Sequence, residues 1–201
     1  MTRAGQDVCA GATTPRRPTT SVPSMDLSEF WDLVETAREE SDDPADGYAV
    51  AEALTRALAD AQPETIEAFD VALGGLLAES YRTDLWAAAY LVNGGASDDS
   101  FDYFRGWLVT QGRDAFEAVV ADPDSLADLA PVRAAMADGE GLECEDLLSV
   151  AWDAYEEATG EELPDTGRAA LPQLETMWDF DDEGEMRARL PRLAALAYDA
   201  D

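Results

Sequence analysis

The side chains of this sequence that are best suited to catalysis or binding gather between Leu85 and Leu108. Three carboxylates and one guanidinium follow each other closely there, from Asp98, Asp99, Asp102 and Arg105. On a helix, residues three or four positions apart face the same side, so this spacing can bring acids and a cation together. Carboxylates can act as general acids and bases, or hold a divalent cation through oxygen ligands. The chemistry indicated is hydrolysis, either carboxylate-based or dependent on a divalent metal.

The same segment also has a structural interpretation, which we favour. The run from Leu85 to Val92 is apolar on every side, which is typical of a central helix. The turn at residues 93–95, Asn-Gly-Gly, would end that helix, and Ser97 would cap the next one. Acids in a first helical turn are stabilised by the helix dipole, and Arg105 could pair with Asp102 or with a neighbouring acid.

The functional interpretation instead places the acids and Arg105 at the edge of a cleft roofed by aromatic rings. Tyr90, Tyr103 and Trp107 would form that roof. A phosphate site is disfavoured, because Asp98 and Asp99 already occupy the helix N-terminus that would bind the phosphate. The candidate functional cluster comprises Trp86, Tyr90, Asn93, Asp98, Asp99, Asp102, Tyr103, Arg105 and Trp107.

Several segments of the chain carry a recognisable family pattern: Phe30 to Glu35, Leu85 to Tyr90, Asn93 to Gly95, Ser97 to Asp99, Phe101, Tyr103 to Leu108 and Ala121 to Leu126. With these segments the chain resembles a bacterial family of unknown function, domain of unknown function 4240. The resemblance covers about residues 25–130. It brings no activity and no catalytic residues to this chain.

Two missing residue types exclude much enzyme chemistry. The 201 residues contain no histidine, and all 13 basic residues are arginines, so lysine is also absent. Ser-His-Asp triads, Cys-His pairs and histidine zinc sites are therefore excluded. Phosphate-binding loops that use a lysine, and Schiff-base lysines, are excluded as well.

The charge is strongly negative and unevenly distributed. The net charge is −31, with +2 in residues 1–24 and −33 in residues 25–201. A compositional bias that favours Ala, Arg, Asp and Glu explains much of it, and an acidic surface also keeps a protein soluble. The alternative is a surface built to meet a basic partner or, in the extreme, to imitate nucleic acid. Direct nucleic-acid binding and anionic membranes are disfavoured, because no basic patch is evident.

These exclusions favour a non-enzymatic, cytoplasmic binding or interaction protein. The expected partner is a basic protein, which this chain could cover as an inhibitor or an immunity protein would. The alternative is a hydrolase centred on the acids of the 98–105 segment and Arg105. We expect no cofactor and no metal, and the sequence leaves the oligomeric state open.

Two further places in the sequence contain residues that could form a chemical site, the segment 179–184 and Cys144. Asp179 to Gly184 places acids and a glycine as the start of an EF-hand loop does. However, loop positions nine and twelve are Arg187 and Leu190, so an acidic solvated turn is favoured. Cys144 could be activated by a helix N-terminus, but neighbouring acids oppose that, and a small buried residue is expected.

The elements that must position these residues are helical throughout. The pattern predicts an all-α fold, a compact array of about eight to ten short helices, with no strand. Residues 1–24 are expected to be a disordered leader, with Met25 as the native start, and residues 25–201 a single helical domain. Helices are predicted over 142–159, with Trp152 on the buried stripe, and over 172–178. The predicted core is Trp31, Leu54, Phe69, Leu73, Trp86, Tyr90, Phe104, Leu108, Leu148 and Trp152.

Overall fold

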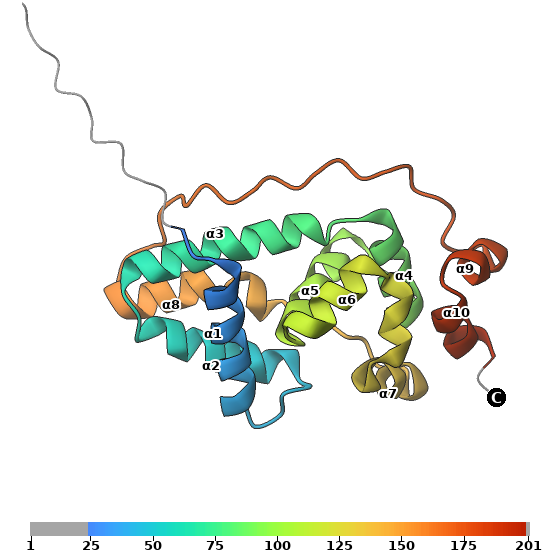
Figure 1. Ribbon diagram of the computed structural model, residues 1–201, viewed down its shortest axis with the longest axis horizontal. Coiled ribbons are helices and arrows are strands. Elements are labelled where there is room, and N and C mark those ends of the chain that lie inside the picture. Colours follow the sequence, from blue (N-terminus) through green and yellow to red (C-terminus); the bar gives the residue numbers. More distant parts are fainter. Residues whose placement is uncertain (1–23, 200–201) are drawn as a thin grey trace, which may run out of the picture.

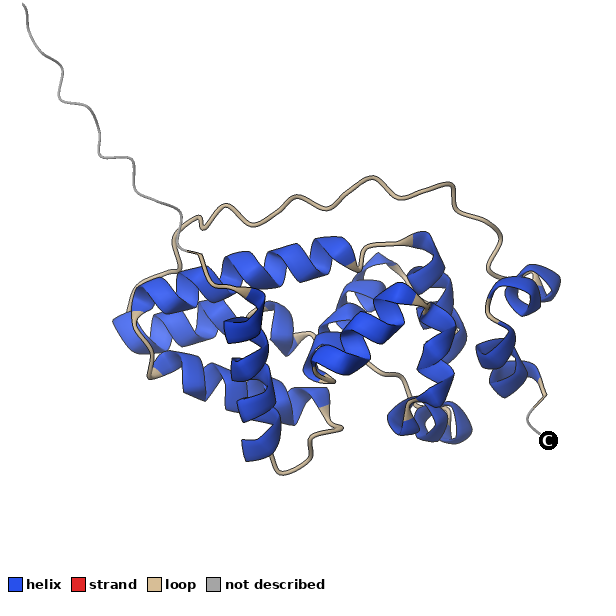
Figure 2. Ribbon diagram, in the orientation of Figure 1, coloured by secondary structure: helices blue, strands red, loops and turns tan. Residues whose placement is uncertain are grey.

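The computed structural model describes residues 24–199, and the leader predicted for residues 1–24 lies, except for Ser24, outside the described residues. The described chain consists of ten α-helices and two 3-10 helices without a strand, which confirms the all-α prediction (Figure 2). The elements are α1 Leu27–Glu40, α2 Gly47–Ala59, α3 Pro63–Glu79, α4 Thr83–Asn93, α5 Asp98–Thr110, α6 Arg113–Ala121, η1 Pro123–Asp128, α7 Ala130–Asp138, η2 Asp146–Leu148, α8 Val150–Thr159, α9 Glu183–Arg189 and α10 Pro191–Tyr198.

Three consecutive helices, α1 to α3, and the distant helix α8 form one end of the molecule. Helix α2 packs between α1 and α8, and α8 also lies along α3 (Figure 1). The apolar faces of these helices meet in the interior, where Phe30 stacks on Phe69 with ring centroids 4.7 Å apart. Helix α8 therefore closes a bundle that α1, α2 and α3 begin.

Helices α4 to α7 and η1 form the other end. Contacts of α5 with α2 and η2 join the two ends, and buried side chains from Phe30 to Ala194 make one continuous hydrophobic cluster. Helix α4 is buried on most sides, as its sequence predicts, and Gly94 ends it in the left-handed conformation at φ +67°. No helix within residues 24–199 combines the length and the apolar character needed to cross a membrane.

A long irregular segment, residues 161–182, follows α8 and is called the strap here. It runs along the outside of α3 to the far end of the molecule, where α9 and α10 lie (Figure 1). Helix α10 contacts α9, η1 and α4. The strap is anchored at Asp70 of α3, whose carboxylate lies 2.7 Å from Arg168, and at Thr83, whose hydroxyl donates to the carbonyl of Glu175 at 3.1 Å.

The structure corrects two of the predicted helices. Residues 172–178 are part of the irregular strap, from which the side chains of Leu174 and Trp178 pack against the core. Residues 142–145 are irregular, and η2 separates them from α8, which begins only at Val150.

The buried face of α8 also differs from the prediction. Val150, Ala151 and Ala154 are the residues of α8 in the core, whereas Trp152 is 51% exposed. The two alanines let α8 approach its neighbours closely, and a tryptophan in their place would not fit against α2 and α3. Tyr90 and Leu148 are half-buried. The other predicted core residues are buried: Trp31, Leu54, Phe69, Leu73, Trp86, Phe104 and Leu108.

Candidate functional site

Arg105 is the centre of the candidate site, and it is almost completely buried. It projects from α5 with only 2% of its surface exposed. One guanidinium nitrogen, Nη1, donates to the carbonyl oxygen of Leu77, and Nη2 pairs with the Asp102 carboxylate. Leu77 lies in the last turn of α3, which has no basic residue of its own. Arg105 therefore supplies the cation that the carbonyl end of α3 favours.

Aromatic rings complete the environment of Arg105. Its guanidinium carbon lies 5.0 Å from the ring centroids of both Tyr81 and Phe101. Phe101 in turn stacks on Trp86, with centroids 4.8 Å apart. Burial lowers the pKa of Arg105, and its Nε atom has no hydrogen-bond partner among the described residues. The charge is thus held in the interior by one carboxylate, one carbonyl and the faces of two rings.

A second group of candidate residues fastens the irregular segment 142–145 to the α4–α5 hairpin. The amide side chain of Asn93 accepts from the Leu142 N–H at 3.0 Å and donates to the Leu142 carbonyl at 3.3 Å. The backbone N–H of Cys144 donates to the carbonyl of Tyr103 at 2.9 Å. Gly106 permits this approach, because a Cβ at its position would overlap the carbonyl oxygen of Cys144. Asn93 therefore has a structural partner.

The remaining candidates point to different partners. The indole N–H of Trp86 donates to the Ala96 carbonyl at 3.0 Å, and Trp107 is 98% buried. The hydroxyls of Tyr90 and Tyr103 donate to Asp181 and Glu145, at 2.6 and 3.2 Å. The partners of Trp86, Tyr90 and Tyr103 are thus Ala96, Asp181 and Glu145, and none of them belongs to the acidic group of residues 98–105.

Asp98 and Asp99 are exposed in the first turn of α5, where Ser97 caps the helix through the Ser100 N–H at 3.2 Å. The structure thus brings Asp102 to Arg105 and leaves Asp98 and Asp99 at the solvent-facing end of the helix. Nowhere in residues 24–199 do three or more Asp, Glu or Cys side chains gather closely enough to hold a metal ion.

Asp102 and Arg105 line one small cavity of about 200 Å³ beneath the strap. Its other walls come from α3, η2 and the strap, including Gly74, Leu148 and Arg168. Gly74 allows the strap to lie close, because a Cβ there would come within 2.9 Å of Arg168 Cγ. Gly74 therefore marks a close approach between α3 and the strap.

The other two chemical segments have local structural partners. Asp179 accepts from the Asp181 N–H at 3.0 Å, and Asp182 caps α9 by accepting from the Gly184 and Glu185 N–H groups. Cys144 is free and buried, and burial raises the pKa of its thiol to about 12. A thiol with that pKa is protonated at neutral pH and is a poor nucleophile.

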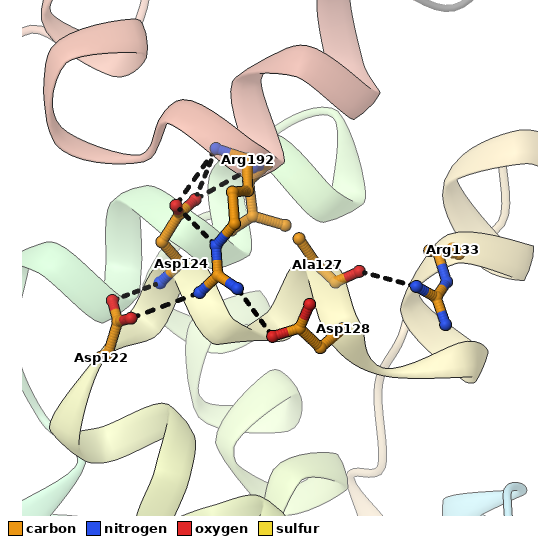
Figure 3. Close-up of polar contacts among 7 residues, drawn as sticks. Asp122, Asp124, Ala127, Asp128, Arg133 and Arg192 are labelled. Carbon is orange, nitrogen blue, oxygen red and sulfur yellow. Dashed lines mark hydrogen bonds and ion pairs between the residues drawn. The ribbon is translucent and has the colours of Figure 1, made fainter.

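A polar network that the sequence did not indicate joins the C-terminal helices to η1. The Asp124 carboxylate is buried and accepts from the backbone N–H groups of Arg192 and Leu193 at 2.9–3.1 Å, at the start of α10 (Figure 3). The Arg192 guanidinium lies among three carboxylates, 3.3 Å from Asp122, 3.1 Å from Asp124 and 2.7 Å from Asp128. Its hydrogen bond to Asp124 is the main cause of its raised pKa.

Sequence reasoning missed this network because its partners are 64–70 residues apart in the chain. The available signals were local ones. Asp122 and Asp124 flank Pro123 at the start of a turn, and Pro191 precedes Arg192 at the start of a helix. Neither of these local patterns indicates that the two segments contact each other.

The fold and its polar contacts define an all-α protein in which a buried arginine on α5 neutralises the carbonyl end of α3. The chain belongs to the family described as "Protein of unknown function (DUF4240)", which matches residues 25–157. This confirms the resemblance seen in the sequence and extends it through most of α8. No curated protein and no solved structure matches the chain. The matched range contains Arg105 and its partners, whereas the strap, α9 and α10 lie outside it.

Proposed function

We propose that this protein is a non-enzymatic, cytoplasmic binding protein whose acidic surface holds a basic partner protein, as an inhibitor or immunity protein would. The observation that carries the proposal is that its arginines are already used internally. Nine of the ten arginines in residues 25–201 form ion pairs with the chain's own carboxylates, and Arg133 donates to the Ala127 carbonyl.

Those ion pairs leave a large excess of negative charge. They engage a dozen different carboxylates among the described residues, while the chain has 44 Asp and Glu. Exposed acids without an ion pair occur on several helices, including Glu39 of α1, Asp99 of α5 and Glu156 of α8. A surface of one sign attracts an oppositely charged partner and speeds its association, more so at low salt.

The geometry gives less support to the alternative hydrolase. Asp102 is paired with Arg105, and Arg105 is held by the end of α3. Asp98 and Asp99 sit in the first turn of α5, where their charges stabilise the helix. Each of these groups thus has a local structural role, and binding by the acidic surface is the function that the arrangement favours.

The test is affinity capture with the full chain at two salt concentrations, followed by mass spectrometry and binding measurements on the captured protein. We expect a partner with a basic surface that binds at about 0.05 M salt and is lost at about 0.5 M, where charges are screened within a few ångströms. A partner that binds equally at both concentrations, or that is acidic, would contradict the proposal.

A further inference from the structure

The exposed face of α8 carries an aromatic side chain that the fold does not use. Trp152 is 51% exposed, whereas Trp31, Trp86 and Trp107 are each at most 6% exposed. A tryptophan offers a large apolar area, and leaving half of it in water stabilises nothing in the free protein. Tryptophan is also among the residues that contribute most to binding at protein interfaces.

The surroundings of Trp152 follow from the antiparallel packing of α8 on α3. Trp152 and Asp70 line a common cavity of about 310 Å³, whose far wall is the strap at Leu163 to Thr166. One turn further along α8, partial burial and the charges of Glu67, Glu161 and Glu64 raise the pKa of Tyr155. Trp152 thus shares a cavity with Asp70 of α3, and Tyr155 lies within reach of the charges of Glu64 and Glu67.

Negative charge surrounds these rings. Asp153, Glu156 and Glu157 are exposed on α8, and Glu156 lies one turn from Trp152, on the same side of the helix. None of these three, nor Glu64 or Glu67, takes part in an ion pair among the described residues.

The chain's own cations are occupied elsewhere. Within residues 24–199, arginines lie over the rings of Tyr81, Phe101, Trp178 and Tyr198, and none lies over Trp152. Arg168, which lines the same cavity, is held 2.7 Å from the Asp70 carboxylate. Within residues 24–199, no arginine therefore covers the Trp152 ring, half of whose surface is exposed.

We propose that Trp152, Tyr155 and Glu156 of α8, with Glu64 and Glu67 of α3, form the docking surface for a basic segment of a partner protein. An arginine or lysine of that segment stacks on Trp152, and its neighbouring cations meet the glutamates. The inference rests on the proposed function and names the surface that performs it. Charge complementarity selects this partner, because an apolar or acidic segment would leave the glutamates desolvated and unpaired.

The test uses the full chain and a ten-residue peptide of alternating glycine and arginine as the probe. Binding is measured by calorimetry at low salt, and its location by amide and indole chemical shifts. We expect Trp152→Ala to weaken binding about fivefold, the size of a cation–π contact of about 1 kcal/mol, and Trp152→Phe to retain most of the affinity. Tyr48→Ala is the matched control, since Tyr48 is an aromatic side chain of 43% exposure on α2, and it should bind like the wild type.

A second pair of variants separates this surface from the overall charge. Glu67→Gln with Glu156→Gln should weaken binding more than Glu39→Gln with Glu40→Gln, which changes the net charge equally on exposed positions of α1. Equal losses in the two pairs, or Trp152→Ala binding like the wild type, would overturn the docking surface and leave the proposed function standing. If the arginine peptide binds no better than its neutral citrulline counterpart, the proposed function fails as well.

Discussion

At the scale of single residues, the buried charge of Arg105 determines how the two ends of the molecule are joined. Replacement by alanine would leave the Leu77 carbonyl without its donor and remove a cation that two rings and a carboxylate hold in place. We expect Arg105→Ala to lower the free energy of unfolding by about 3–5 kcal/mol, as removal of one partner of a buried pair does. Urea unfolding measures this loss.

The matched comparison for Arg105 is its partner Asp102, whose side chain is 39% exposed. Asp102→Asn keeps a hydrogen-bond acceptor and can turn to solvent, so a loss of about 1 kcal/mol is expected. If the two substitutions cost the same, the charge of Arg105 is not held chiefly by the α3 carbonyl and the rings.

The thiol of Cys144 makes stability depend on pH in the alkaline range. Its pKa is raised from 9.0 to about 12 in the folded protein, so the unfolded chain loses the proton first. Stability from this group is complete below pH 9 and falls as pH rises toward 12. Between pH 8 and 10.5 the wild type should lose about 2 kcal/mol more than Cys144→Ala. Parallel pH profiles of the two proteins would contradict this assignment.

Local residue roles were predictable from the sequence, and remote ones were not. The cap at Ser97 and the pair of Asp102 with Arg105 involve residues within one helical turn, where spacing alone defines the contact. The bond from Arg105 to Leu77 joins residues 28 apart, and that from Arg192 to Asp124 residues 68 apart. Only the fold brings such residues together.

At the scale of elements, the approach of the 142–145 segment to α5 depends on one glycine. We expect Gly106→Ala to destabilise the protein by about 1–3 kcal/mol, because its Cβ would press against the Cys144 carbonyl. Gly75→Ala in α3 is the control, since nothing lies within 4 Å of the added Cβ, and it should stabilise the helix by about 0.5–1 kcal/mol. Thermal unfolding of both variants measures the difference, and equal effects would exclude the close contact.

The attachment of α10 to η1 should depend on Asp124 more than on Arg192. Asp124→Ala removes the acceptor for the backbone N–H groups of Arg192 and Leu193 as well as the ion pair, at a cost of about 2–4 kcal/mol. Arg192→Ala keeps those backbone bonds and removes a side chain that is 44% exposed, for about 1 kcal/mol or less. Hydrogen exchange of the α10 amides should rise far more in the first variant than in the second, with α3 amides unchanged. Faster exchange of the α10 amides in Arg192→Ala than in Asp124→Ala would contradict this ranking of the two residues.

The all-α class and the approximate number of helices could be predicted from the sequence, but the orientation of α8 could not. The pattern predicts Trp152 on the buried stripe beside Ala151, whereas the stripe of the structure continues from Ala151 to Ala154. The choice depends on how closely α2 and α3 approach, and the structure places the alanines in the core. The path of the strap could not be predicted either, because its anchors Asp70 and Thr83 come 96 and 92 residues before the strap residues that they bind.

At the scale of the whole molecule, the strap divides the chain into a part that matches the family and a part that lies outside the match. Residues 161–178 make no backbone–backbone hydrogen bond to another described residue. Leu171 and Met177, both 46% exposed, offer cleavage sites to a protease. We expect limited proteolysis with thermolysin to cut first in the strap, and early cuts within α3 or α8 would contradict this.

The strap also determines how tightly α10 is held, because it sets the effective concentration of α9 and α10 near η1. While the strap is intact, α9 and α10 remain near η1 at a concentration on the order of millimolar, whatever the concentration of the protein. A single cut turns that contact into an ordinary association between two molecules. The severed α9–α10 fragment should therefore stay bound at high protein concentration and leave on dilution or in salt, as size-exclusion chromatography of the cut protein would reveal.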